Sequence, residues 1–148
     1  AKEYDKLANI LKITEFKNFK YVEHFFMGAL YQNSGKLDLA QKEISKALQL
    51  KSNDPWIYYQ SATIYMEENN FAEAEKLLNK AVEINPEFVP AYNKLAVVYL
   101  SQNNFEKALS SIDKALKLDP DNFEAQQTRN SIQSYFQQNI LQFLQKNN

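Results

Sequence analysis

A pattern of small and bulky side chains recurs in this sequence at a fixed interval of 34 residues. Three copies align, over residues 21–54, 55–88 and 89–122. Small residues, which let helices approach closely, recur at three places: Gly28, Ala62 and Ala96; Ala40, Ala74 and Ala108; Ala47, Ala81 and Ala115. Bulky residues that would fill the gaps recur beside them, as in Tyr31, Tyr65 and Tyr99, or Ile44, Leu78 and Ile112. The interval predicts stacked structural repeats.

Each copy is predicted to be helical. Apolar residues from Phe71 to Val82, and again from Phe105 to Leu116, follow steps of three and four that place them on one stripe of a helix. Asp54 followed by Pro55 reads as an N-cap with proline at the first helical position, so a helix should begin there. The predicted fold class is therefore all-α, built from pairs of amphipathic helices.

The spacing and residue types resemble the tetratricopeptide repeat (TPR), a family with small residues, a tyrosine and a proline at fixed repeat positions. The third copy is similar to the family pattern throughout. The other two depart from it, with His24 where an aromatic residue is usual, Ser52 where proline is usual and Ser61 where leucine is usual.

The resemblance implies antiparallel helix pairs stacked into a right-handed superhelix, an α-α solenoid whose first helices line a concave groove. We expect one TPR domain over residues 1–148, with three repeats between two helical flanks. The N-terminal flank, residues 1–20, is expected to hold a short helix through Tyr4, Leu7 and Leu11. The C-terminal flank, residues 123–148, keeps helical spacing for longer than one ordinary repeat helix and should act as a cap.

The composition argues against an enzyme. The chain has one histidine, no cysteine and no glycine-rich phosphate loop, so no cofactor or metal site is expected. His24 occupies a repeat position that is normally packed between helices, and we interpret it as a core residue. Glu67 and Glu68 are adjacent on a helix and should point in different directions. No catalytic residue is predicted.

Nucleic acid and membranes are also not expected as partners. A formal net charge of −1 provides no counterion-releasing surface for a polynucleotide. Lysines on the second helices alternate with acidic residues, and Asp113 and Lys117 are predicted to form an ion pair four residues apart. No apolar run reaches the roughly 20 residues that span a bilayer, and direct insertion by this segment is not expected.

The groove implied by the resemblance is the predicted site for a partner protein. Mapping the family's inward-facing positions onto this chain places a set of first-helix residues in the groove, Gln32 among them. From this set we select the predicted contact residues: Phe25, Phe26, Trp56, Tyr59, Gln60, Thr63, Asn93, Lys94 and Val97. The aromatic members predict an apolar partner segment, helical or extended, and the polar members would set its register. The alternative is that these rings pack against the N-terminal helix or line the core between repeats.

One subfamily of tetratricopeptide repeats binds the acidic C-terminal tails of heat-shock chaperones through lysines, asparagines and an arginine at set repeat positions. Those positions hold Phe25, Ala29, Gln60, Pro90 and Lys94 here, and only Lys94 matches. The next register, which includes Tyr59, Thr63 and Lys94, fits less well. A clamp for acidic tails is therefore disfavoured.

The end of the chain offers a possible second interface at Ile140, Leu141, Phe143 and Leu144. These residues could fold back to close the superhelix, or could form a homodimer or bind another partner. An oligomerisation module is therefore the alternative function.

Arg129 is the only arginine, and the sequence begins at Ala1 rather than at methionine. These features favour a bacterial protein of the cell envelope or cytoplasm, with an anchor or signal removed before Ala1, and leave the compartment open.

Overall fold

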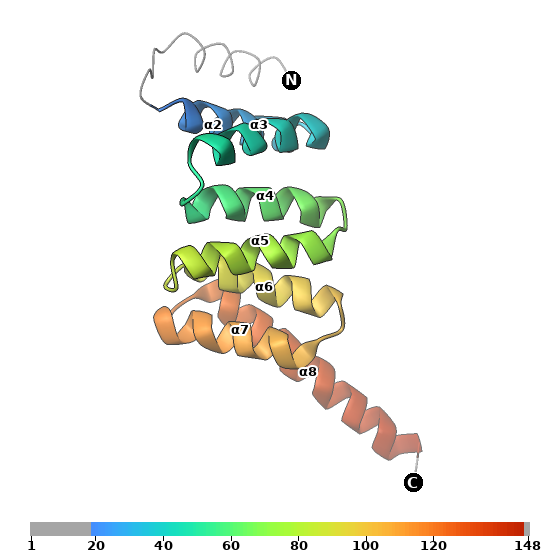
Figure 1. Cartoon of the computed structure of the whole chain (residues 1–148). Helices are drawn as coiled ribbons and strands as arrows, with labels where there is room; N and C mark the ends of the chain where they lie inside the picture. Colours follow the sequence, from blue (N-terminus) through green and yellow to red (C-terminus); the bar gives the residue numbers. More distant parts are fainter. Residues whose placement is uncertain (1–18, 147–148) are drawn as a thin grey trace. The chain divides into compact units, whose positions relative to one another are not determined.

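The computed structural model describes residues 19–146, except for the side chains of residues 140, 141, 143 and 144. Every regular element in this part of the chain is an α-helix (Figure 1). The helices are α2 (Lys20–Asn33), α3 (Leu37–Leu50), α4 (Pro55–Glu67), α5 (Phe71–Ile84), α6 (Val89–Ser101), α7 (Phe105–Leu118) and α8 (Phe123–Lys146). The helix predicted through Tyr4, Leu7 and Leu11 lies outside the described residues.

The chain divides into two compact units, Ala1–Pro86 and Glu87–Asn148. In unit 1, α2 packs on α3, α3 on α4 and α4 on α5. In unit 2, α6 packs on α7 and α7 on α8. The prediction of a single domain over the whole chain stays a prediction, and each unit is described by itself.

Local side-chain chemistry fixes where three of the helices begin. The Asp54 side chain accepts a hydrogen bond from the Trp56 backbone N–H at 3.0 Å, and Pro55 occupies the first turn, so the predicted start of α4 is confirmed. Asn70 caps α5 and Asn104 caps α7 in the same way. Because these caps use only neighbouring residues, the sequence already carries them.

The turns between paired helices share one backbone conformation. Gly35, Asn69 and Asn103 all have positive φ, at 70°, 59° and 58°. Glycine and asparagine tolerate this left-handed region better than other residues. The three positions are one repeat interval apart, a signal that the analysis of apolar spacing missed.

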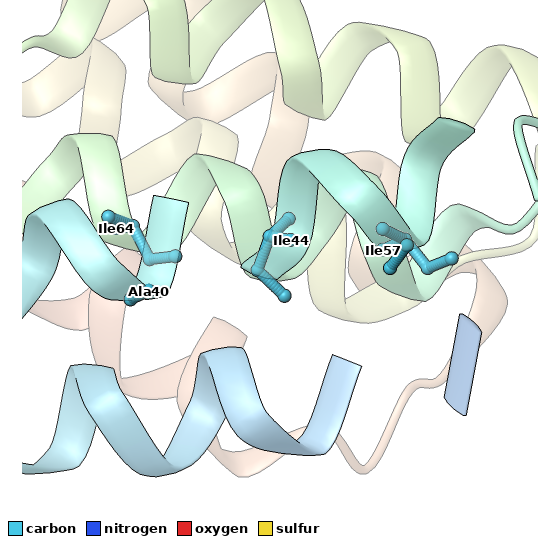
Figure 2. Packing of buried hydrophobic residues seen from close by; sticks show 5 residues of the cluster. Ala40, Ile44, Ile57 and Ile64 are labelled. Atoms are coloured by element: carbon cyan, nitrogen blue, oxygen red, sulfur yellow. The ribbon is translucent and has the colours of Figure 1, made fainter. Parts of the chain in front are cut away.

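The core of unit 1 forms where α3 meets α4. Ala40 and Ile44 of α3 lie with Ile57 and Ile64 of α4 in one buried cluster, which also includes Ala47 (Figure 2). Partly buried side chains from α2 and α3 pack against the cluster: Tyr21, Phe25, Tyr31, Leu37 and Leu48. The recurring small and bulky positions therefore pack as predicted.

Unit 2 has its own buried residues. Leu95 and Ala96 of α6, Ile112 of α7, and Ala125 and Ile132 of α8 are all buried. Helix α8 has 24 residues against 14 in α7, which confirms the prediction of a long final helix. Arg129 of α8 forms an ion pair with Asp113 of α7, the carboxylate that was predicted to pair with Lys117.

None of the helices over residues 20–146 combines the length and the apolar character that crossing a membrane would require.

Gly28 allows α2 to approach α3 closely. A Cβ atom placed there would lie 2.6 Å from both Cγ1 and Cδ1 of Ile44. We expect Gly28→Ala to lower the free energy of unfolding by roughly 1–3 kcal/mol through overpacking. Urea denaturation should show a smaller loss for the double variant with Ile44→Val than the sum of the two single losses. Strictly additive losses would contradict this contact.

Candidate functional site

An apolar pocket of about 400 Å³ opens between α2 and α4 in unit 1. We call it the α2–α4 pocket, and its lining consists of Tyr21, Val22, Phe25, Phe26, Asp54, Trp56, Ile57, Tyr59 and Gln60. Five of the residues predicted to contact a partner therefore lie around one cavity. They are Phe25, Phe26, Trp56, Tyr59 and Gln60.

Two pairs of aromatic rings form part of the pocket wall. Phe25 and Phe26 meet edge to face, with ring centroids 5.6 Å apart and planes at 80°. Trp56 and Tyr59 meet in the same way, at 5.7 Å and 76°. Edge-to-face pairing is a favourable arrangement of ring quadrupoles, so each pair holds its own geometry.

The four rings differ in how far they reach solvent. Phe26 is 48% exposed and Trp56 is 51% exposed, while Phe25 and Tyr59 are partly buried. Phe25 also packs against the buried cluster of α3 and α4, so the alternative of a core role holds in part for this residue. The other alternative, packing against the N-terminal helix, concerns residues outside the described part of the chain.

The start of α4 forms a polar edge of the pocket that the sequence analysis did not assign to the site. Lys51 Nζ donates to the Tyr21 hydroxyl at 3.1 Å and lies 4.5 Å from the centre of its ring. The same ammonium lies 3.4 Å from Asp54 Oδ2. The hydrogen bond to Tyr21 raises the pKa of Lys51, since it favours the charged form. Asp54 thus connects this edge to the backbone of Trp56.

A row of polar side chains continues from the pocket along α2 and α4. Gln60 Nε2 donates to Gln32 Oε1, and Gln32 Nε2 donates to Thr63 Oγ1 at 3.3 Å and to Glu67 Oε1. Thr63 in turn donates to the Gln60 carbonyl at 2.8 Å. Unit 1 therefore presents an aromatic end and an amide end on neighbouring turns of the same two helices. Gln32 belongs to this row; it was predicted to face the groove but was not selected as a contact residue.

The remaining predicted contact residues belong to unit 2, where two of them already bond to α8. Asn93 is only 4% exposed, and its Nδ2 donates to Asn122 Oδ1 at 2.9 Å and to Glu124 Oε2 at 3.2 Å. Lys94 Nζ pairs with Glu124 Oε1 at 3.0 Å. Val97 is partly buried. Burial and these bonds make Asn93 a residue that joins α6 to α8, and its predicted role in setting the register of a partner stays a prediction.

His24 lies between α2 and α3 rather than in an apolar core. Its Nδ1 is 2.6 Å from Glu43 Oε2, and Lys46 Nζ donates to Glu43 Oε1 at 2.7 Å. Burial by itself would raise the pKa of Glu43, but the hydrogen bonds from Lys46 and His24 outweigh it, and the pKa is lowered. His24 therefore lies between two helices, as interpreted from its repeat position. Its contact there is polar rather than apolar, because Glu43 of α3 faces it.

The adjacent carboxylates Glu67 and Glu68 do not face each other. Glu67 bonds to Gln32 and Glu68 to Gln41, so the two carboxylates turn to different helices, as predicted. Among residues 19–146, no cluster of three or more histidine, aspartate or glutamate side chains could hold a metal ion.

Comparison with known proteins bears on the repeats directly. A model described as tetratricopeptide repeat matches residues 32–96 and again residues 66–132. These matches cover most of the chain and confirm the resemblance inferred from the 34-residue interval. The search of curated proteins finds no match.

Solved structures share the helical-repeat fold. The first TPR of Spaghetti (RPAP3), bound to the HSP90 peptide SRMEEVD, is 26% identical, with a TM-score of 0.75 over 79% of this chain and 93% of that one. The first TPR domain of human RPAP3 is 25% identical, with a TM-score of 0.76 over 80% and 94%. MamA is 20% identical, with a TM-score of 0.74 over 97% and 90%, and shows the fold alone. The predicted all-α solenoid class is confirmed.

The Glu43 contacts predict an acid-dependent loss of stability. A lowered folded-state pKa contributes stability above the unfolded value of roughly 4.3, and this contribution is lost as pH falls through the folded pKa. Glu43→Gln should therefore cost about 1 kcal/mol at pH 7 and progressively less as the pH is lowered through that range. Urea denaturation across the acid range measures this, with the exposed Glu106→Gln as control. An equal loss at all pH values would contradict it.

Proposed function

Because this chain belongs to the tetratricopeptide repeat family, whose members are protein–protein interaction modules, we propose that it is an adaptor that binds an apolar segment of a partner protein. The segment would be helical or extended, and its contact would be the α2–α4 pocket. The observation that carries this proposal is the half-exposed pair Phe26 and Trp56 at the mouth of one apolar cavity. Family members work by binding rather than catalysis, and no reaction is proposed.

The size and chemistry of the pocket support an apolar anchor. Its volume of about 400 Å³ falls within the usual range of ligand-binding cavities. Complete burial of an exposed apolar side chain contributes on the order of 1.5–3 kcal/mol, so covering a half-exposed ring contributes about half of that, before the cost of ordering the partner. The edge-to-face ring pairs are already formed, so little of that gain is spent on arranging them.

The polar row supports a fixed orientation for the bound segment. Gln60 lines the pocket and also bonds to Gln32, so an apolar anchor would lie next to side-chain amides. An amide can both donate and accept a hydrogen bond, and it can therefore meet either the backbone or a polar side chain of the partner. Thr63 extends the same row by one turn. Specificity would come from these groups and affinity from the rings.

An acidic peptide is a poorer fit to this pocket. The Spaghetti (RPAP3) domain was solved with SRMEEVD, a peptide with three acidic side chains. In the present chain, Phe25 stands at a position where such a clamp uses a lysine, and its ring belongs to the apolar wall of the pocket. Lys94, the one matching residue, is paired with Glu124. We therefore favour an apolar ligand over an acidic tail.

Self-association through the C-terminal helix is a second candidate function, and one observation favours it. Residues 133–139 of α8 are all exposed, including Tyr135 and Phe136. The side chains first predicted for this interface, those of Ile140, Leu141, Phe143 and Leu144, lie outside the described structure. A homodimer through α8 and a partner bound at the α2–α4 pocket use different surfaces and are compatible.

The groove proposal is tested with the double variant Trp56→Ala, Tyr59→Ala, after circular dichroism has shown that it stays folded. A partner is first recovered from a cell lysate with the native domain, and the bound segment is then titrated as a synthetic peptide. We expect the double variant to bind it about 100-fold more weakly or worse, since two ring anchors are lost. SRMEEVD serves as the acidic comparison peptide.

Phe123→Ala is the matched control, because Phe123 is an aromatic residue of α8 that is 70% exposed. It should leave the affinity for the peptide unchanged. If the double variant binds the segment as tightly as the native domain does, the α2–α4 pocket is not the binding site. If SRMEEVD binds more tightly than the apolar segment, the preference for an apolar ligand is wrong.

A further inference from the structure

Three aromatic rings join α7 to the middle of α8 in unit 2. The Phe105 ring stacks on Tyr135, with centroids 5.2 Å apart and planes at 15°, and meets Phe136 at 5.1 Å and 65°. Because Phe105 is the first residue of α7, these rings mark the last place where α7 can support α8. Beyond these rings α8 continues to Lys146, and Figure 1 shows it extending past the N-terminal end of α7.

The second half of α8 carries no charged residue before Lys146, its last residue. Between Arg129 and Lys146, 16 consecutive residues lack aspartate, glutamate, lysine and arginine. Helices that face water usually carry charged residues on the exposed side. Loss of charge is instead typical of the centre of a protein interface. Tyr135 is 50% exposed and Phe136 is 39% exposed within this stretch.

One stripe of this stretch has the chemistry of a surface that is complementary to itself. Residues at helical spacing lie on one side of α8 and are all exposed: Ser131, Tyr135, Gln138, Asn139 and Gln142. A side-chain amide is both a donor and an acceptor, so an amide surface can pair with an identical one. A surface of lysines or of glutamates would repel its copy. The absence of charge also gives no reason for an oppositely charged partner to bind here.

We propose that this stripe, the α8 stripe, pairs with the same stripe of a second copy in an antiparallel, two-fold symmetric contact. The proposal rests on the second candidate function and names its surface. The stripe from Tyr135 to Gln142 is centred between Gln138 and Asn139. Antiparallel pairing about that centre sets Tyr135 of one copy against Gln142 of the other, and Gln138 against Asn139. The half-exposed tyrosine ring is then covered.

The expected dimer is weak and reversible. Pairing from Ser131 to Lys146 spans 16 residues, or about 24 Å of helix. A contact between two helices of that length covers less than the roughly 800 Å² per partner that stable complexes bury. In this register Lys146 faces Ser131 of the other copy rather than a second lysine, so no like charges oppose each other. The α2–α4 pocket belongs to unit 1 and is not used.

The experiment measures the mass of the full chain by sedimentation equilibrium from low to high micromolar concentration. The native chain should shift from one copy toward two as concentration rises. Gln138→Lys and Gln138→Glu should each weaken the dimer about tenfold or more, because like charges meet near the two-fold axis. An equimolar mixture of the two variants should regain a dimer at least as tight as that of the native chain.

The control variant is Gln133→Lys, which adds the same charge at an exposed position on another side of α8 and should leave the dimer intact. A native chain that stays at the mass of one copy throughout overturns both the self-association function and this surface. A native dimer that both Gln138 variants leave unchanged overturns the surface alone. If each variant is a monomer and the mixture stays monomeric, the stripe does not pair with itself.

Discussion

The contact between Ile44 and the bare backbone of Gly28 is the constraint on which the rest of unit 1 depends. The Ile44 side chain occupies the space that any side chain at position 28 would need, so α2 packs closely on α3. The same isoleucine belongs to the buried cluster with Ile57 and Ile64 of α4, so one side chain joins three helices. Gly28 of α2 faces α3. The bulky residues of α2 at positions 22, 25 and 26 line the pocket between α2 and α4.

The pocket follows from that orientation together with the way α4 begins. Asp54 caps the helix and holds the Trp56 backbone, while Lys51 links the same carboxylate to Tyr21 of α2. The aromatic pairs on α2 and α4 therefore face a common cavity. One turn further along, the Gln32 and Gln60 amides bond to each other, and apolar character ends there. Such a surface is suited to a partner segment with an apolar side chain flanked by polar groups.

Unit 2 uses its polar groups differently. Asn93 and Lys94 bond to the first turn of α8 through Asn122 and Glu124, which secures the start of that helix on α6. Arg129 and Asp113 then join α8 to α7, and the three rings around Phe105 close the contact. Beyond these rings α8 continues without a charged residue as far as Lys146. This lack of charge is the physical basis for proposing that α8 contacts a second copy of the chain. The two proposed surfaces thus lie in different units.

Much of this structure can be predicted from the sequence, because its causes are local or periodic. Apolar spacing sets the helices, Asp54 and Pro55 set a helix start, and the recurring small positions identify the repeats. The aromatic residues of the pocket could be predicted for the same reason, since their repeat positions fix the side of the helix they share.

Polar partnerships were decided only by the tertiary structure. The sequence identified Gln60, Asn93 and His24 as residues of interest, but not that they would meet Gln32, Glu124 and Glu43. Those partners lie 19 to 31 residues away, and each bond depends on rotamers and on small helix displacements that no sequence period encodes. The sequence by itself determined the repeats and their apolar faces, since burial follows the helical period. Tertiary packing alone decided which polar groups are buried, because hydrogen bonding requires both partners to be in place.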